Sequence, residues 1–159
     1  MVGSLRMGLL VKHRDIDLHI YSSELSVSDS FLAVAHLAQN GVVRHVEYRN
    51  LIDTDEHCIE WHAGYVDDGG EEWQVDMIHI LRGSRYDGYF ERVADRISAV
   101  LTEEMRRAVL LLKYLTPDDC HVAGIEDYRA VIEGGVRTYE DFLEWRCDHP
   151  LLGVVEWMP

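Results

Sequence analysis

The sequence predicts an α+β fold, with a mixed β-sheet and flanking helices in front and a helical C-terminal half. Before residue 88, four short segments have the apolar and β-branched character of strands. From residue 89 onward, apolar residues recur every three or four positions, as they do on amphipathic helices. No linker separates the two parts. We therefore expect one domain over residues 1–159, with a sheet region over 1–88 and a helical region over 89–159.

Strands are expected over residues 15–21, 42–48, 58–66 and 73–81. The last two flank residues 67–71 (DDGGE), whose acidic and glycine residues are typical of a tight turn. This pair is therefore expected to form an antiparallel hairpin.

The first expected helix covers residues 31–39, opened by residues 28–30 (SDS) and stopped by Asn40-Gly41. Two more helical runs end at Thr116-Pro117. Their apolar residues at helical spacing are Val93, Ile97, Val100, Leu101, Met105, Val109, Leu112 and Leu115.

Two shorter helices are expected near the C-terminus. One covers residues 125–133 and closes at Gly134-Gly135. The other begins at Thr138, which with Asp141 resembles a capping box, and stops before Pro150.

Composition narrows the function classes. The chain has 159 residues, 47% hydrophobic, which suits one compact core. Its formal charge of -14 repels phosphate backbones, so no long nucleic acid is expected as a partner. No apolar stretch reaches the roughly 20 residues of a membrane span, and no signal peptide is evident. We expect a cytoplasmic protein with no membrane partner.

The three cysteines, Cys58, Cys120 and Cys147, are an odd number without CxxC spacing. They are expected to be reduced thiols, and a structural zinc site is not expected.

Two aspartates stand on one face of the first expected strand. In residues 15–21, apolar and polar residues alternate, so Asp15 and Asp17 point the same way, roughly 6.5 to 7 Å apart along the backbone. A third, Asp76, interrupts an apolar strand, where a charge needs a partner or a metal. Such carboxylates suit two Mg²⁺ or Mn²⁺ ions roughly 3.5 to 4 Å apart.

Residues 3–18 read GSLRMGLLVKHRDIDL, and residues 73–78 read WQVDMI. This pattern resembles the polymerase-beta-like nucleotidyltransferase superfamily: a Gly-Ser turn, roughly ten residues, Asp-x-Asp on a strand, and a later acidic strand. Gly8-Leu9 matches a frequent form of the motif. The resemblance covers roughly residues 2–81. It implies a nucleotidyltransferase-like sheet, as found in small enzymes that modify antibiotics.

The resemblance also implies roles for individual residues. Gly3 and Ser4 would hold the triphosphate of a nucleoside triphosphate, with ATP the expected co-substrate. Asp15 and Asp17 would bind both Mg²⁺ ions, while Asp76 would bind the catalytic metal and help activate an acceptor hydroxyl. The reaction would transfer a nucleoside monophosphate in line and release pyrophosphate.

Three other polar residues, Lys12, Arg14 and His62, have more than one reading. Lys12 and Arg14 either contact phosphate or belong to a solvated basic loop. If the hairpin turn centres on Gly69, His62 lies opposite or diagonal to Asp76. His62, which shares a strand face with Glu60, then either tunes Asp76 or contacts substrate, or is only a hydrogen-bonded structural residue.

The acceptor is expected to be a small neutral or cationic molecule, or a protein side chain. The helical half carries few basic residues near its acids. The acids are Glu103, Glu104, Asp118, Asp119, Glu126 and Asp127. The alternative reading is that they only keep the helix surfaces solvated. A non-catalytic nucleotide-binding or partner-binding module is the alternative. This alternative is supported by the short segment before Gly3, only Met1 and Val2, where the family usually has a helix and a strand, and it is opposed by the intact set of Asp15, Asp17 and Asp76.

Overall fold

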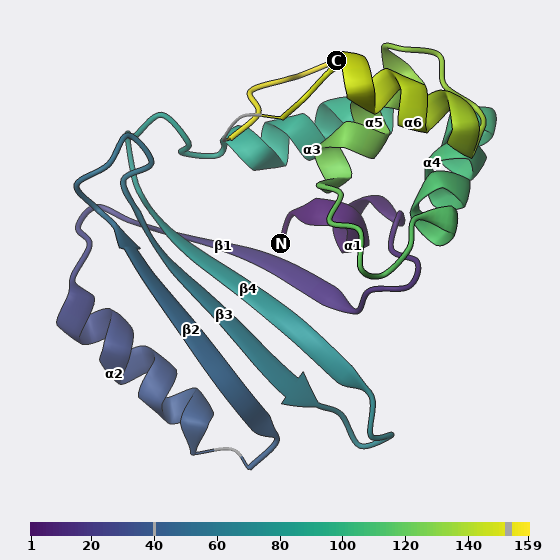
Figure 1. The fold of residues 1–159 in the computed structure, drawn as a ribbon. Helices are drawn as coiled ribbons and strands as arrows, with labels where there is room; N and C mark the ends of the chain where they lie inside the picture. Colours follow the sequence, from purple (N-terminus) through teal and green to yellow (C-terminus); the bar gives the residue numbers. More distant parts are fainter. Residues whose placement is uncertain (40, 152–153) are drawn as a thin grey trace.

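The computed structural model describes residues 1–39, 41–151 and 154–159. In these residues it contains a four-stranded mixed sheet and six helices, which confirms the α+β class (Figure 1). The sheet and one helix form one side of the molecule, and the four C-terminal helices gather on the other.

The strands are β1 (Asp15–Ser22), β2 (Val43–Leu51), β3 (Cys58–Val66) and β4 (Glu72–Leu81), in the sheet order β1-β4-β3-β2. β1 and β4 are parallel, and the β2–β3 and β3–β4 pairs are antiparallel. All four strands were expected, and the hairpin is confirmed. β2 runs three residues beyond the predicted end because it stays paired with β3 to the start of that strand.

The Gly-Ser segment, expected as a turn, forms a short helix, α1 (Gly3–Met7). α2 (Val27–Ala38) begins four residues earlier than predicted, because Ser26 and not the later serines provides its cap. The Ser26 hydroxyl accepts a hydrogen bond from the N–H of Asp29 at 3.2 Å. The predicted stop at Asn40-Gly41 includes Asn40, which lies outside the described residues.

The helical half consists of α3 (Tyr89–Val100), α4 (Glu103–Leu115), α5 (Gly124–Ile132) and α6 (Tyr139–Asp148), as expected. The predicted cap of α6 is present, because the Thr138 hydroxyl accepts from the N–H of Asp141 at 3.2 Å. Within the described chain, none of the helices has the length and apolar character to cross a membrane.

The two sheet faces differ. On one face, Trp61 packs with Phe31 of α2 and Tyr48 of β2 at ring distances of 4.6 to 4.7 Å, and its indole N–H donates to Ser30. The main core forms instead among α1 and the C-terminal helices, around residues such as Phe142. Because side chains alternate along a strand, the face opposite Trp61 is free to carry polar groups.

Candidate functional site

A row of polar side chains crosses the sheet on the face opposite Trp61. Asp17 of β1 pairs with Asp76 of β4, and Asp76 pairs with His62 of β3. Asp15 pairs with Gln74 and lies two residues before Asp17, so it shares this face. The structure therefore brings the three predicted aspartates to one face, as their alternation indicated. Their role as metal ligands stays a prediction.

Asp76 is held by two neighbours. His62 Nδ1 and Gln74 Nε2 each lie 2.8 Å from the same oxygen, Asp76 Oδ1. A carboxylate only accepts, so Nδ1 of His62 carries the proton. On its other side, His62 Nε2 is 3.6 Å from a Glu60 oxygen and has no hydrogen-bond partner among the described residues. The expected position of His62 opposite Asp76 is confirmed.

Like charges crowd the row. Burial raises the pKa of Asp17 to about 6, and the charges of Asp15 and Asp76 add to the rise. Burial also raises the pKa of Asp15, where Lys113 acts in the opposite direction and Asp76 in the same one. A bound cation would relieve this repulsion.

The Gly-Ser segment lies directly against Asp17. The N–H of Val2 donates to the carbonyl of Asp17 at 2.9 Å. Gly3 has φ +70°, and a Cβ built there would lie 1.7 Å from Asp17 Oδ2. Only glycine allows this approach, so α1 is set beside the carboxylate row by a contact that any side chain would block.

Sequence reasoning missed two residues of the helical half that complete the site, Lys113 and Tyr128, and expected a third, Asp127, only as one of the acids facing the acceptor. Lys113 Nζ donates to Ser4 Oγ at 2.7 Å and to Tyr128 OH at 3.2 Å, and Ser4 Oγ lies 2.9 Å from that same hydroxyl. Asp127 is 2% exposed, its Oδ1 has no hydrogen-bond partner in the described chain, and burial raises its pKa to about 7. The only available signal was composition: Lys12 and Lys113 are the two lysines of the chain.

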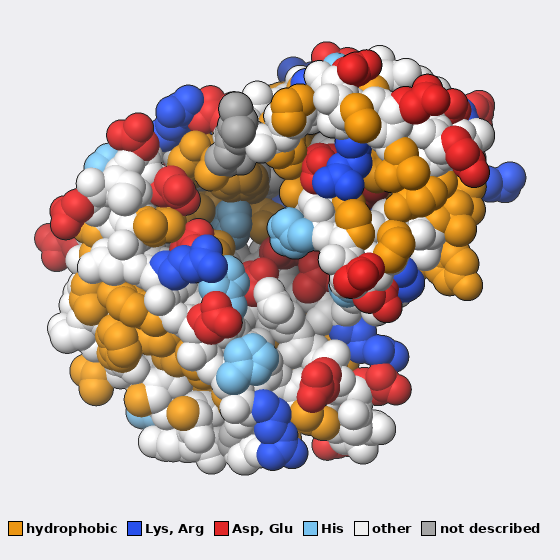
Figure 2. Space-filling view, in the orientation of Figure 1, with side chains coloured by type: hydrophobic (Ala, Val, Ile, Leu, Met, Phe, Trp, Pro, Cys, Tyr) orange, Lys and Arg blue, Asp and Glu red, His pale blue; other side chains and the backbone are white. Residues whose placement is uncertain are grey.

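A cavity of about 570 Å³, which we call the basic cavity, opens between the strand ends and the segment 116–124. Both lysines line it, together with Arg14, and Asp15 lies in its wall. Lys12 Nζ is 2.8 Å from Asp118, and an Arg14 nitrogen is 2.8 Å from Glu71. The predicted basic residues therefore reach this cavity, but each also has an acidic partner. Figure 2 shows the molecule hollowed between its two sides, with acidic and histidine side chains in the hollow.

The acidic wall expected from the helical half is only partly present. Asp118, Asp119 and Asp127 line the basic cavity. Glu103 and Glu104 line neither of the two described cavities. The carboxylate of Glu126 is taken up by an ion pair with Arg146, so three of the six expected acids face this cavity and the others do not. Spacing on a helix does not show which face turns toward a distant sheet.

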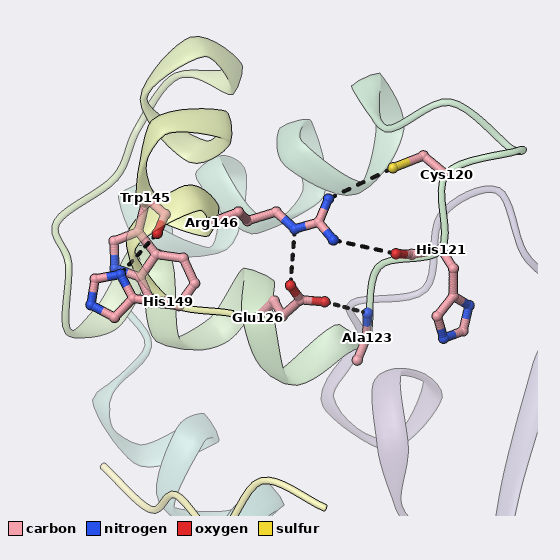
Figure 3. A network of polar contacts seen from close by, with 7 residues as sticks. All are labelled: Cys120, His121, Ala123, Glu126, Trp145, Arg146 and His149. Carbon is pink, nitrogen blue, oxygen red and sulfur yellow. Dashed lines mark hydrogen bonds and ion pairs between the residues drawn. The ribbon is translucent and has the colours of Figure 1, made fainter. Parts of the chain in front are cut away.

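That ion pair anchors the cavity wall (Figure 3). Arg146 Nε of α6 donates to Glu126 Oε1 at 2.9 Å, and a second nitrogen reaches the carbonyl of His121 at 3.4 Å. The other Glu126 oxygen accepts from the N–H of Ala123 at 2.8 Å. Arg146 also lies 3.7 Å from the Cys120 sulfur. The segment that closes the basic cavity is thus fixed to two helices.

Another acidic group lies further along β3. In the described part of the chain, Glu56, Cys58 and Glu60 are the one set of three such residues whose ligand atoms all lie within 4.8 Å of one another. Burial raises the pKa of Cys58 to about 12, and Glu60 and Glu56 add to the rise, so its thiol stays protonated and is a poor metal ligand. The three aspartates are spaced more widely than this set.

Fold and site together define an α+β protein with three carboxylates across one face of a mixed sheet and a basic cavity beside them. The chain was compared with models of protein families, with curated proteins and with solved structures, and nothing matched. The geometry of the site therefore carries the functional assignment.

Proposed function

We propose that this chain is a metal-dependent nucleotidyltransferase of the polymerase-beta-like type. It would move a nucleoside monophosphate from a nucleoside triphosphate, with ATP the expected donor, to a hydroxyl of a small acceptor and release pyrophosphate. The observation that carries the proposal is the pairing of Asp17 with Asp76 on adjacent parallel strands, with Gly3 in contact with Asp17. The three carboxylates therefore share one sheet face, and the glycine backbone of Gly3 lies against one of them.

The carboxylate row suits Mg²⁺ or Mn²⁺. Asp15, Asp17 and Asp76 offer oxygen ligands, which these hard cations prefer. The raised pKa of Asp17 reflects unfavourable burial and repulsion, which a divalent cation would offset. Both hydrogen bonds to Asp76 fall on Oδ1, which leaves Oδ2 for a metal among the contacts of the described residues.

The basic cavity suits the phosphates. Lys12, Arg14 and Lys113 supply positive charge beside Asp15. A triphosphate there would replace the contact of Lys113 with the neutral Ser4 hydroxyl by a stronger charge-assisted one, and would compete with Asp118 for Lys12. Ser4 also lines this cavity and would offer its hydroxyl to a phosphate oxygen, whereas the space beside Gly3 is taken by the Asp17 carboxylate.

Each of these residues would then have a separate role in the transfer reaction. The acceptor oxygen bonds to the α-phosphorus while the bond from that phosphorus to the bridging oxygen breaks, and pyrophosphate leaves. Metal ions held by the aspartates would stabilise both oxygens. Asp76, oriented by His62, is placed to take up the proton of the acceptor hydroxyl. The net charge of -14 favours a small neutral or cationic acceptor, or a protein side chain, over long nucleic acid.

A non-catalytic nucleotide-binding or partner-binding module is the second candidate. It is favoured by the acidic partners of Lys12 and Arg14, which already neutralise two of the expected phosphate ligands. Such a module would bind nucleotide without turning it over.

Incubation with Mg²⁺ and nucleoside triphosphates labelled at the α-phosphate tests the proposal, with pyrophosphate release as the readout. We expect release with the wild type and none with Asp17→Asn or Asp76→Asn. Asp68→Asn, in the exposed hairpin turn, is the matched control and should retain release. Nucleotide binding without release in the wild type, over a broad panel of acceptors, would favour the non-catalytic module. Equal release by wild type and Asp17→Asn would overturn the catalytic assignment.

A further inference from the structure

A second cavity, of about 350 Å³, is lined by residues of α1, β1, α3, α5 and the C-terminal segment; we call it the aromatic cavity. It meets the basic cavity at Ser4, Asp15 and Gly124, which line both. Beyond these shared residues the two linings differ, and Asp17 belongs to the aromatic cavity alone. Of the carboxylate row, Asp15 therefore stands where the two cavities join and Asp17 faces the aromatic one, whereas Asp76 lines neither.

The rings of the aromatic cavity come from four elements of structure. His19 lies on β1, Tyr89 and Phe90 on α3, Tyr128 on α5, and Trp157 in the C-terminal segment. Phe90 contacts His19 edge-on at 5.2 Å between ring centres, and contacts Tyr89 in the same way at 5.2 Å. Fixed rings of this kind favour a flat partner, by stacking or by edge contacts.

Cationic side chains distinguish the two cavities. The basic cavity has four of them, Lys12, Arg14, Arg44 and Lys113, although five acids also line it: Asp15, Glu72, Asp118, Asp119 and Asp127. In the aromatic cavity, none of the described lining residues is Lys or Arg, and the acids are Asp15 and Asp17 at the carboxylate row. A phosphate group would meet repulsion and no counter-charge in the aromatic cavity. An uncharged ring would bury apolar surface there at no electrostatic cost.

We propose that the aromatic cavity binds an uncharged aromatic group of one of the two substrates, placed against the same carboxylates that hold the metal ions. The ring belongs either to the nucleobase of the triphosphate or to an aromatic acceptor. A volume of about 350 Å³ matches the small end of ligand pockets and suits a one-ring or two-ring group. With phosphates in the basic cavity and the ring in the aromatic one, the reacting phosphorus would lie at Asp15 and Asp17.

The role in the reaction rests on the proposed function, whereas binding of a ring does not need it. Naphthol, an uncharged two-ring probe, can therefore be titrated by calorimetry without any turnover. Two variants change the cavity: Ala94→Leu fills it from α3, and Trp157→Ala removes a ring from the C-terminal segment. Lys12→Gln is the matched control, with magnesium tripolyphosphate as its probe, because Lys12 lines the basic cavity alone and its partner Asp118 lies outside the aromatic one.

The wild type should bind naphthol, and both cavity variants should weaken that binding by about tenfold or more, a change of about 1.4 kcal/mol. The affinity for magnesium tripolyphosphate should be the same in both cavity variants as in the wild type. Lys12→Gln should weaken tripolyphosphate binding and leave naphthol binding unchanged. Trp157→Ala keeps the test decisive if Ala94→Leu does not fold. Unchanged naphthol affinity in folded Trp157→Ala, or competition between naphthol and tripolyphosphate, would overturn the proposal.

Competition identifies the source of the ring. If adenosine and Mg-ATP displace naphthol and tripolyphosphate does not, the ring is the nucleobase. If naphthol and Mg-ATP bind together, the cavity serves an aromatic acceptor, and the expected acceptor class narrows from cationic to uncharged aromatic. Either result supports ring binding. If the wild type binds naphthol but releases no pyrophosphate, the proposed function is rejected and the assignment of this cavity still holds.

Discussion

His62 Nδ1 and Asp76 Oδ1 lie 2.8 Å apart across the β3–β4 pair, and this contact ties the third carboxylate of the row to the middle of the sheet. The hairpin sets the contact, because its register puts the two residues directly opposite each other. His62 is therefore a positioning residue for Asp76.

The first prediction concerns that contact. His62→Ala should cost about 1 to 3 kcal/mol of unfolding free energy, because Asp76 loses a buried hydrogen bond. In a double-mutant cycle with Asp76→Ala, the two changes should be coupled by at least about 0.5 kcal/mol. His79→Ala is the control, since His79 bonds to Ser22 on the opposite sheet face. Its effect on the unfolding free energy should simply add to that of Asp76→Ala. Urea unfolding of the three single variants and the two double variants measures both cycles; a purely additive His62 cycle would contradict the prediction.

The second prediction concerns Gly3. Gly3→Ala should abolish stabilisation by Mg²⁺, because the new Cβ would displace the Asp17 carboxylate. Gly83→Ala controls for backbone strain: Gly83 has φ +77°, but a Cβ added there would meet no atom within 4 Å. Both variants should lose about 1 kcal/mol or more from the left-handed backbone. In thermal melts with and without Mg²⁺, a retained metal shift in Gly3→Ala would count against this account of the site.

The third prediction concerns pH. Asp17 has a pKa of about 6 in the folded protein, above the ordinary value of 3.8. The folded state therefore holds this proton more tightly, and its contribution to stability is lost as pH rises from about 4 to about 6. The loss should be about 2 kcal/mol or less, and Asp17→Asn should remove it. Because Mg²⁺ binds the ionised carboxylates, its thermal shift should grow over the same range. A metal shift that is constant from pH 4 to pH 7 would be inconsistent with this site.

The fourth prediction concerns the anchor of the cavity wall. Arg146→Met should destabilise the fold by about 3 to 5 kcal/mol, because it leaves the buried Glu126 carboxylate without its cation. Arg146→Met with Glu126→Met should recover much of the loss, since no charge is then buried. Denaturant unfolding of the single and double variants decides the point. A double variant no more stable than Arg146→Met would show that shape, not charge, holds this wall.

Local patterns in the sequence determined the parts of the site that lie within single strands and one hairpin. Alternation placed Asp15 and Asp17 on one face, and the 67–71 turn fixed the register of His62 with Asp76. Both are short-range consequences of strand geometry. The four C-terminal helices followed from their apolar spacing in the same way.

Only the tertiary structure decided which residues from distant parts of the chain lie beside the carboxylate row. Lys113 reaches Ser4 across 109 positions of sequence, and the Gly3 backbone lies on Asp17 through a pairing of Val2 that no local pattern encodes. The sequence likewise did not predict which of the acids in the helical half line the cavity and which lie elsewhere. Periodicity fixes which residues share a face of one element, whereas the packing of the whole core fixes which faces turn toward each other.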